Sequence, residues 1–394
     1  MGEELNHERA ARELAAVVSQ QGREIAETIA NATRGFLIDD LPDDSRRNDL
    51  FDSLSGRGQL QIATGFTEQE VLSLHQCMRP FCVTVRQSGV KPKSSWLDML
   101  VCYLSWAKLS LDYLKLSVVL GSISASCLED NIGRIRPVLK TTLFQKWFDS
   151  PLRPCPLAGS PFPEVALIVD AHTTPCYRPK APFEEAKIYY DGKNHTYGLK
   201  TEVAVSAQPP YYCMQISKHV PASVHDFELF KSGYERYLPY LLKLPDERMA
   251  LPGDPPRHWA LLCDKGYIGP DSASPDARHI CPIKKPQNHQ DRAYNVTHSR
   301  YRVYVECFFG RLLGLFQIFH SIYRWSHKHF DDDFVICCAL TNEVITVLGL
   351  DEGDFKLYQS LQEKRVRQHE ESQRKRKQEQ DSYRERRRRR LSLG

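Results

Sequence analysis

The pattern of hydrophobic and polar residues changes near residue 150. From Thr67 to about Trp147 apolar residues recur at helical spacing, and Thr67 with Glu70 forms a capping box that begins the first helix of this block. From about residue 164 onward, short apolar runs alternate with turn residues, which predicts strands. Five prolines fall within 149–163, and we place a domain boundary in that segment.

The N-terminal part is predicted to precede any folded domain. Residues 3–33 have the periodicity of a charged helix, and 38–60 are rich in Pro, Gly, Asp and Ser, which is typical of a linker. We therefore divide the chain into an N-terminal helix and linker, a helical region, a strand-containing domain and a polar tail. Their expected bounds are 1–60, 61–150, 162–350 and 355–394.

The helical region contains a candidate helix-turn-helix. The first predicted helix covers residues 111–120, and a turn at Gly121 follows it. The second predicted helix follows this turn and is expected to end at Pro137. This pattern is that of a DNA-binding or assembly motif. The alternative is a helical hairpin within a bundle. Glu129 and Asp130 favour the alternative, because carboxylates at the start of the second helix repel phosphates.

The second region predicts an α/β domain. A helical insert is expected at about 226–243, and two helices at about 299–318 and 331–349 close the region. This order indicates a mixed sheet flanked by helices. The predicted strands are Val165–Asp170, Ile188–Tyr190, Leu199–Ser206, Tyr211–Ser217, Trp259–Asp264 and His279–Ile283.

Three acidic residues stand in apolar surroundings. Asp170 and Asp264 each end an apolar run, and Glu306 lies inside an apolar, helical stretch. A carboxylate in such a place costs several kcal/mol unless it is paired or binds a cation. Two strand ends and one helix make an all-oxygen site suited to Mg²⁺ or Mn²⁺, the kind of site that cuts phosphodiesters.

Each of the three acids also has a structural interpretation. Asp170 can hydrogen-bond the turn that follows it. Asp264 precedes Lys265 in an ordinary turn sequence. Glu306 can pair with Arg302, four residues earlier, on a solvated helix face. The apolar neighbours of Glu306 argue against a fully solvated face.

Charge is concentrated at the C-terminal end. Residues 361–390 hold 13 Lys or Arg and 6 Asp or Glu, whereas the rest of the chain holds 40 and 43. The tail is too polar to bury a core, but its composition is compatible with a solvated helix. The arginine-rich run at 384–390 favours nuclear import or non-specific nucleic-acid contact, and hence a nuclear protein. A merely solubilising tail is the alternative.

Cysteine usage and hydropathy exclude several classes of protein. The twelve cysteines include no CxxC pair and no Cys/His spacing typical of zinc. No signal peptide and no apolar run of membrane-spanning length is visible. We expect reduced, mostly buried thiols in a cytosolic or nuclear protein.

Six motifs, in this order and spacing, carry a family resemblance. They are IVDAHT (168–173), YYDGKNHTYGLK (189–200), SVHD (223–226), DKGY (264–267), VECFFGRL (305–312) and ALTN (339–342). Together they resemble the DDE superfamily endonuclease domain of Harbinger-type transposases, over about 162–345. Two positions depart from the family pattern, Ala171 in place of Gly and Cys307 in place of Arg, and neither removes a metal ligand.

The resemblance implies an RNase H-like fold with Asp170, Asp264 and Glu306 as catalytic residues and ligands of two divalent cations, Mg²⁺ or Mn²⁺. It implies metal-dependent hydrolysis at transposon ends, followed by strand transfer into target DNA. It also implies DNA as partner, a homo-oligomer and, in some relatives, a separate DNA-binding protein. Two alternatives remain: a domesticated, non-catalytic DNA-binding protein, and a stand-alone nuclease.

Other residues are candidates for supporting roles. Asp226 either lies near the metals or caps the helix expected at Phe227, and we favour the cap. His172 and His225 lie beside acids and either orient a carboxylate or are structural. Candidate contacts to DNA phosphates, with solvated surface positions as the alternative, are Lys193, Lys200, Lys284, Lys285 and Arg311. Arg311 alternatively braces the site.

Overall fold

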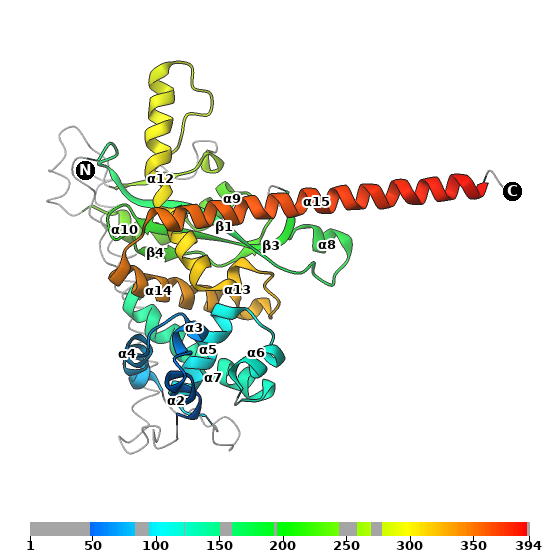
Figure 1. The fold of residues 1–394 in the computed structure, drawn as a ribbon. Coiled ribbons are helices and arrows are strands. Elements are labelled where there is room, and N and C mark those ends of the chain that lie inside the picture. The colour runs from blue at the N-terminus through cyan, green and yellow to red at the C-terminus, as the bar shows by residue number, and fades with distance from the viewer. Residues whose placement is uncertain are drawn as a thin grey trace.

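The computed structural model describes residues 48–82, 94–121, 123–149, 160–192, 195–243, 258–268 and 278–391. A helical region lies on one side of a sheet-containing domain, and a long C-terminal helix extends away from the body (Figure 1). The helix expected at 3–33 lies outside the described residues.

The helical region is built around one buried helix, α5 (Trp96–Leu109). Twelve of its 14 residues are buried, which fits its almost continuous apolar sequence. The other elements of the region surround it: α2 (Asp49–Gly56), α3 (Leu60–Thr64), α4 (Glu68–Met78), η2 (Arg79–Phe81), α6 (Tyr113–Leu120), α7 (Ala125–Phe144) and η3 (Gln145–Asp149).

Two expectations for this region differ from the structure. The expected linker at 38–60 is helical in α2, because Leu50, Phe51 and Leu54 form an apolar face that packs into the core. Pro137 does not end α7, which continues to Phe144. Proline removes one helical hydrogen bond, but buried leucines beyond it, at 139 and 143, hold the last turns against the core.

Two local predictions are confirmed by hydrogen bonds. The Thr67 side chain accepts from the Glu70 backbone N–H, and the Glu70 side chain accepts from the Thr67 backbone N–H, so the capping box is present. Helices α6 and α7 flank Gly121, whose φ of 77° lies in the left-handed region that favours glycine. Glu129 and Asp130, near the start of α7, are exposed.

Within the described residues, the sheet has seven strands, and a long strand lies at its centre. Strand β1 (Val165–Pro175) pairs antiparallel with β3 (Thr196–Ser206) and parallel with β6 (Ala260–Cys263). Beyond them, β7 (His279–Ile280) pairs parallel with β6. Three more strands pair antiparallel with β3: β2 (Tyr190–Asp191), β4 (Cys213–Ile216) and β5 (Val220–Pro221). This mixed sheet, flanked by helices, has the strand order of an RNase H-like fold.

Alternate residues of β1 face two different cores. Leu167 and Val169 pack against the short elements α9 (Asp226–Ser232), η4 (Tyr234–Tyr237) and α10 (Leu238–Leu241). Ile168 belongs to the larger core on the opposite face. A strand turns successive side chains to opposite faces, so Asp170 and His172 point to the same face as Ile168.

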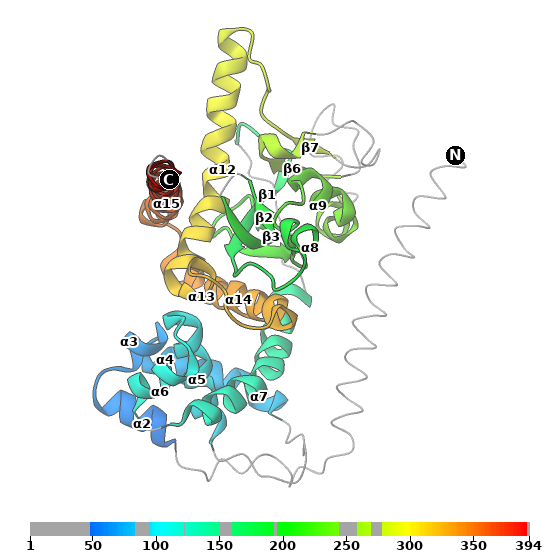
Figure 2. The same ribbon diagram turned by 90° about the vertical axis from the view of Figure 1, so that its right-hand side faces the viewer.

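Long helices cover that second face. Helix α12 (His289–Leu315) lies between the sheet and α15 (Glu352–Leu391), as Figure 2 shows. Helices α13 (Gln317–His320) and α14 (Phe330–Leu348) lie below the sheet, next to the helical region (Figure 1). The remaining short elements are α8 (Phe183–Lys187), η5 (Lys265–Tyr267) and η6 (His327–His329).

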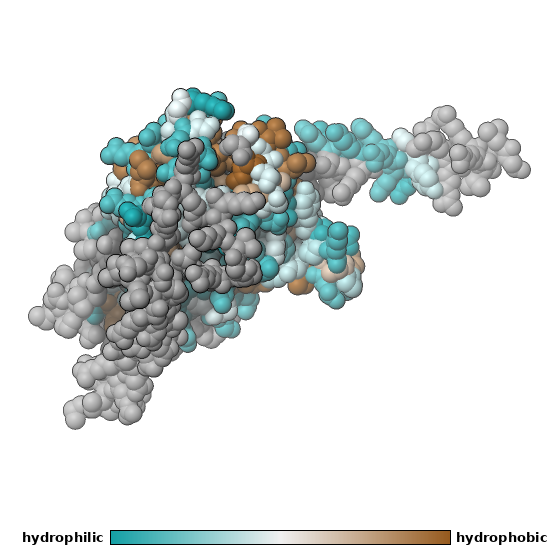
Figure 3. All heavy atoms as spheres, turned by 90° about the horizontal axis from the view of Figure 1, so that it is seen from below, coloured by the Kyte–Doolittle hydropathy of each residue, from teal (hydrophilic) through white to brown (hydrophobic). Residues whose placement is uncertain are grey.

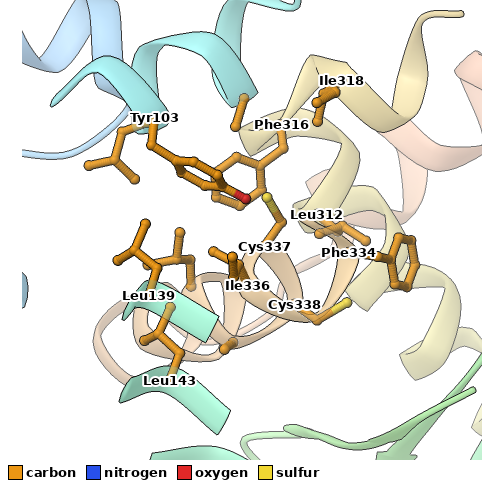
Figure 4. Close-up of a cluster of buried hydrophobic side chains, with 14 of the residues drawn as sticks. Tyr103, Leu139, Leu143, Leu312, Phe316, Ile318, Phe334, Ile336, Cys337 and Cys338 are labelled. Carbon is orange, nitrogen blue, oxygen red and sulfur yellow. The ribbon is translucent and has the colours of Figure 1, made fainter. Parts of the chain in front are cut away.

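The helical region and α14 share one hydrophobic core. Tyr103 of α5 and Leu139 of α7 meet Ile336 and Cys337 of α14 (Figure 4). At the centre of this contact Asp333 is fully buried, and its carboxylate accepts from the Arg136 guanidinium at 2.6 Å. The hydroxyls of Tyr103 and Tyr323 donate to the same carboxylate, each at 3.0 Å.

Helix α15 is anchored at its start and free beyond it. The Arg311 guanidinium of α12 donates to both Asp354 carboxylate oxygens, at 2.6 and 2.8 Å, and Tyr358 stacks on Phe309. Gly310 allows this approach, because a Cβ there would lie 1.9 Å from the Asp354 carbonyl oxygen. The rest of the helix projects from the body (Figure 1), and its described surface is hydrophilic (Figure 3).

The state of the described cysteines and the polarity of the described helices bear on disulfide bonding and on membrane insertion. The described cysteines are free thiols, most of them buried. Within the described residues, every helix is too short or too polar to cross a membrane.

Candidate active site

Asp170 and Asp264 are brought together by the parallel pairing of two strands. Val169 of β1 lies in register with Cys263 of β6, so the next residue along each strand is one of the two acids. Asp264 directly follows β6 and precedes η5. Strand β1 continues to Pro175, so the prediction that the first strand ends at Asp170 is wrong. Asp170 lies inside β1, beside the point where the shorter strand β6 ends, and this brings the two carboxylates together.

Glu306 approaches from α12, and one guanidinium joins all three acids. Arg302 Nη1 donates to Asp170 Oδ2 at 2.6 Å, and Arg302 Nη2 donates to Glu306 Oε1. Arg302 Nε lies 3.6 Å from Asp264 Oδ1. The three predicted acids, separated by up to 136 residues in the chain, thus converge on a single cation.

The structural interpretations of the acids account for only part of this geometry. The Glu306–Arg302 pair exists, but Glu306 is 18 % exposed and Arg302 17 %, so the helix face is not solvated. Asp170 accepts a hydrogen bond from the Ala171 backbone N–H at 2.9 Å and also contacts Arg302. Asp264, 38 % exposed, is the most accessible of the three acids.

Burial and the neighbouring charges act on the site in opposite directions. Burial raises the pKa of Asp170, the Arg302 guanidinium acts to lower it, and the Asp264 carboxylate raises it again. For Arg302, burial acts to lower the pKa, but the three carboxylates outweigh burial and raise the pKa above its usual value. Three carboxylates against one guanidinium leave an excess of negative charge, which a further cation would compensate.

The donor set fits a hard divalent cation. Asp170, Asp264 and Glu306 offer carboxylate oxygens, the ligands that Mg²⁺ and Mn²⁺ prefer, and a cationic group already lies among them. In the present arrangement of the described residues, no three acidic, histidine or cysteine side chains are placed to bind an ion directly. The carboxylates here are spaced around a guanidinium.

Asp226 lies beside the Asp264 turn but does not cap its helix. Helix α9 begins at Asp226, and its N-cap is His225, whose Nδ1 accepts from the Phe227 backbone N–H at 3.3 Å. The expected cap is therefore one residue earlier than predicted. A Cβ on Gly266, two residues after Asp264, would lie 2.9 Å from Asp226 Oδ2, so this turn and α9 are in close contact.

Two predicted supporting residues are buried in structural contacts. His172 lies on the same face of β1 as Asp170, two residues further along, where its ring packs against Phe309 and Tyr358 at 5.2 and 6.3 Å. Arg311 pairs with Asp354 of α15 and not with any of the three acids.

The predicted phosphate contacts are placed differently from one another. Lys200 is 12 % exposed and contacts Asp226 Oδ1 at 2.8 Å and the Val224 carbonyl oxygen. Lys284 and Lys285 are exposed in the loop between β7 and α12. Lys193 lies outside the described residues. Contacts of these lysines with DNA stay a prediction.

Two further groups were missed by sequence reasoning. The spacing of four residues predicts the pair of Arg302 with Glu306. It does not predict the contacts of Arg302 with Asp170 and Asp264. Glu202, fully buried on β3, accepts from Arg236 and from the Tyr237 hydroxyl on the opposite face of the sheet. Its position inside an apolar strand was a visible signal of a buried, paired carboxylate.

The segment that carries this site is similar to a known family. Residues 169–342 match the family model of the DDE superfamily endonuclease. The matched segment includes all three acids and Arg302. No curated protein and no solved structure matches the chain significantly. The match supports the motif resemblance at the level of the superfamily, over the 174 residues from 169 to 342.

Proposed function

We propose that this DDE superfamily endonuclease domain carries out divalent-metal-dependent hydrolysis of DNA phosphodiesters, as part of a Harbinger-type transposase or a protein derived from one. The proposal rests mainly on one observation: Asp170, Asp264 and Glu306 converge from two strands and a helix on one cationic centre. The superfamily match over the same residues supports it.

The three acids would have distinct tasks. Asp170 would hold the cations from the central strand β1, Asp264 from the end of β6, and Glu306 from α12, one helical turn from Arg302. Bound divalent cations supply the activation of an attacking water or 3′-hydroxyl and the stabilisation of the leaving oxyanion. The chain itself supplies position, because the sheet and α12 hold the carboxylates in one place before DNA binds.

The remaining parts of the chain suggest how DNA would reach the site. Lys284 and Lys285 are exposed in the loop that leads into α12. Residues 361–390 of α15, which projects from the body (Figure 1), carry a net charge of +7, whereas the rest of the chain carries −3. Both fit contacts with phosphates. A nuclear location, a homo-oligomeric assembly, strand transfer and a separate DNA-binding partner protein belong to the same proposal.

A second candidate function is DNA binding without catalysis. The position of Arg302 favours it, because a guanidinium already compensates part of the carboxylate charge without a metal. Retention of all three acids favours the nuclease. A stand-alone nuclease, which cuts without strand transfer, would have the same site.

The test is nicking of supercoiled plasmid by the full chain with Mg²⁺ or Mn²⁺, comparing wild type with Asp264→Asn. Asp52→Asn is the matched control, because Asp52 is exposed on α2, outside the candidate DNA-binding helices. We expect metal-dependent nicking by wild type and the control and none by Asp264→Asn. Equal nicking by both variants would overturn the assigned site. Binding of DNA without any nicking by wild type would favour the non-catalytic candidate.

A further inference from the structure

We propose that Arg302 is a resident counter-ion of the carboxylate site, which holds the three acids together before a metal binds and must leave their centre for divalent cations to enter. This inference rests on the proposed function, since it takes the three acids to be the metal ligands. It adds a positioning role for Arg302 to the metal-binding role that the proposed function gives to the three acids.

The geometry supports a central position for the guanidinium. Each of the three Arg302 nitrogens faces a different carboxylate: Nη1 faces Asp170, Nη2 faces Glu306 and Nε faces Asp264. An ordinary helix pair would engage Glu306 alone. Arg302 joins β1, the end of β6 and α12, three elements that are distant in the chain, through one planar group.

The guanidinium and a divalent cation would compete for the same oxygens. Arg302 contacts one oxygen on each acid, on the side that faces the centre of the cluster. A metal that bridges these acids needs oxygens turned toward the same centre, and two cations so close together repel each other. Metal binding therefore requires the guanidinium to move aside, which its flexible side chain permits while α12 stays in place.

In the metal-free protein, Arg302 takes the place of the metal between the three acids. Without a cation, three partly buried carboxylates at one point would repel one another and raise one another's pKa. Arg302 removes part of that repulsion and keeps the acids converged. If only the metal held the three acids together, the acids would move apart whenever the metal left. The consequence is a weaker affinity for the metal, because the metal must first displace Arg302.

The test is Mn²⁺ binding by the full chain, measured by isothermal titration calorimetry for wild type, Arg302→Gln, Arg302→Lys and Asp170→Asn. Arg300→Gln is the matched control, because it removes the same charge from an exposed position on the same helix. We expect Arg302→Gln to bind Mn²⁺ at least about tenfold more tightly than wild type, since it removes both the competitor and its repulsion. Arg302→Lys, which cannot reach three acids with one planar group, should fall between them, and Arg300→Gln should match wild type.

Thermal unfolding provides a second readout on the same proteins. Without metal, Arg302→Gln should unfold at a lower temperature than Arg300→Gln, and Mn²⁺ should raise its midpoint by more than it raises that of wild type. If Arg302→Gln cannot be obtained folded, Arg302→Lys carries the test, with tighter Mn²⁺ binding than wild type as the expected result. Unchanged or weaker Mn²⁺ binding by the folded Arg302 variants would overturn the inference.

The controls separate this inference from the proposed function. If Asp170→Asn binds Mn²⁺ as well as wild type does, the three acids are not the metal site, and both proposals fail. If Asp170→Asn loses Mn²⁺ binding while the Arg302 variants gain none, the metal site stands and only the role of Arg302 is refuted.

Discussion

The cluster around Asp333 and the cluster around Arg302 each combine arginine with carboxylate, and they differ in how far their charges are balanced. Around Asp333, one carboxylate meets one guanidinium, Arg136, and two tyrosine hydroxyls. Around Arg302, one guanidinium meets three carboxylates. The first cluster is closed, because every charge has its partner and none is accessible. The second has excess negative charge and remains partly accessible.

The difference separates a structural cluster from a chemical one. The Asp333 cluster joins the helical region to α14, and its charges serve only the packing around them. The Arg302 cluster lies where β6 ends beside β1, and Asp264 there remains 38 % exposed. Excess charge that a cation or substrate can reach is what a metal-dependent nuclease requires, and a purely structural ion pair avoids it.

The largest expected effect is on activity, and it should occur in the Arg302 cluster alone. Glu306→Gln and Asp170→Asn should each lower the nicking rate on the order of 10³-fold, because each removes a negatively charged metal ligand. Their unfolding midpoints should stay close to that of wild type. Asp333→Asn should keep its nicking rate if it is folded. A comparable loss of rate in Asp333→Asn would show that the two clusters are not functionally distinct.

The next effect is on stability, and it should be larger in the closed cluster. Asp333→Ala leaves the Arg136 guanidinium buried without its carboxylate, which should lower the free energy of unfolding by about 3–5 kcal/mol. Urea unfolding would measure it. The double variant Asp333→Leu with Arg136→Met removes both charges, so it should lower the free energy of unfolding by less than Asp333→Ala does. A larger cost for the double variant would contradict this account.

A smaller effect is expected in the dependence of stability on pH. Burial raises the pKa of Asp333 from 3.8 to about 6, and the Arg136 guanidinium offsets only part of that rise. Between these two pH values the folded protein keeps a proton that the unfolded chain has lost, so the free energy of unfolding falls as pH rises through this window. Across this window the raised pKa of Asp333 should lower the free energy of unfolding by roughly 3 kcal/mol.

The measurement is urea unfolding of wild type and Asp333→Asn between pH 4 and pH 7. The variant has no proton to lose at this position, so its stability should fall less with rising pH than that of wild type. Parallel curves for the two proteins would show that Asp333 does not titrate in this range. Taking the difference between two proteins removes the contributions of the other acids.

Local patterns predicted most of the elements because local interactions decide them. The Thr67 capping box, the helix pair around Gly121 and the apolar runs that became β1 and β6 depend on neighbouring residues. Where packing decides, the sequence was less informative. Helix α2 forms in a polar segment because its three apolar residues reach the core, and α7 continues past Pro137 for the same reason.

By itself, the sequence determined the identity of the candidate acids. Asp170 and Asp264 end apolar runs of the sequence and Glu306 interrupts an apolar helix, and the cost of such placements is a property of the residues alone. Only the tertiary structure decided that the three acids share one centre, and that Arg302 lies in it. The parallel register of β1 with β6 and the docking of α12 on the sheet set those distances. The register joins Val169 to Cys263, 94 positions apart, and Arg302 contacts Asp170, 132 positions away. No local spacing encodes such contacts.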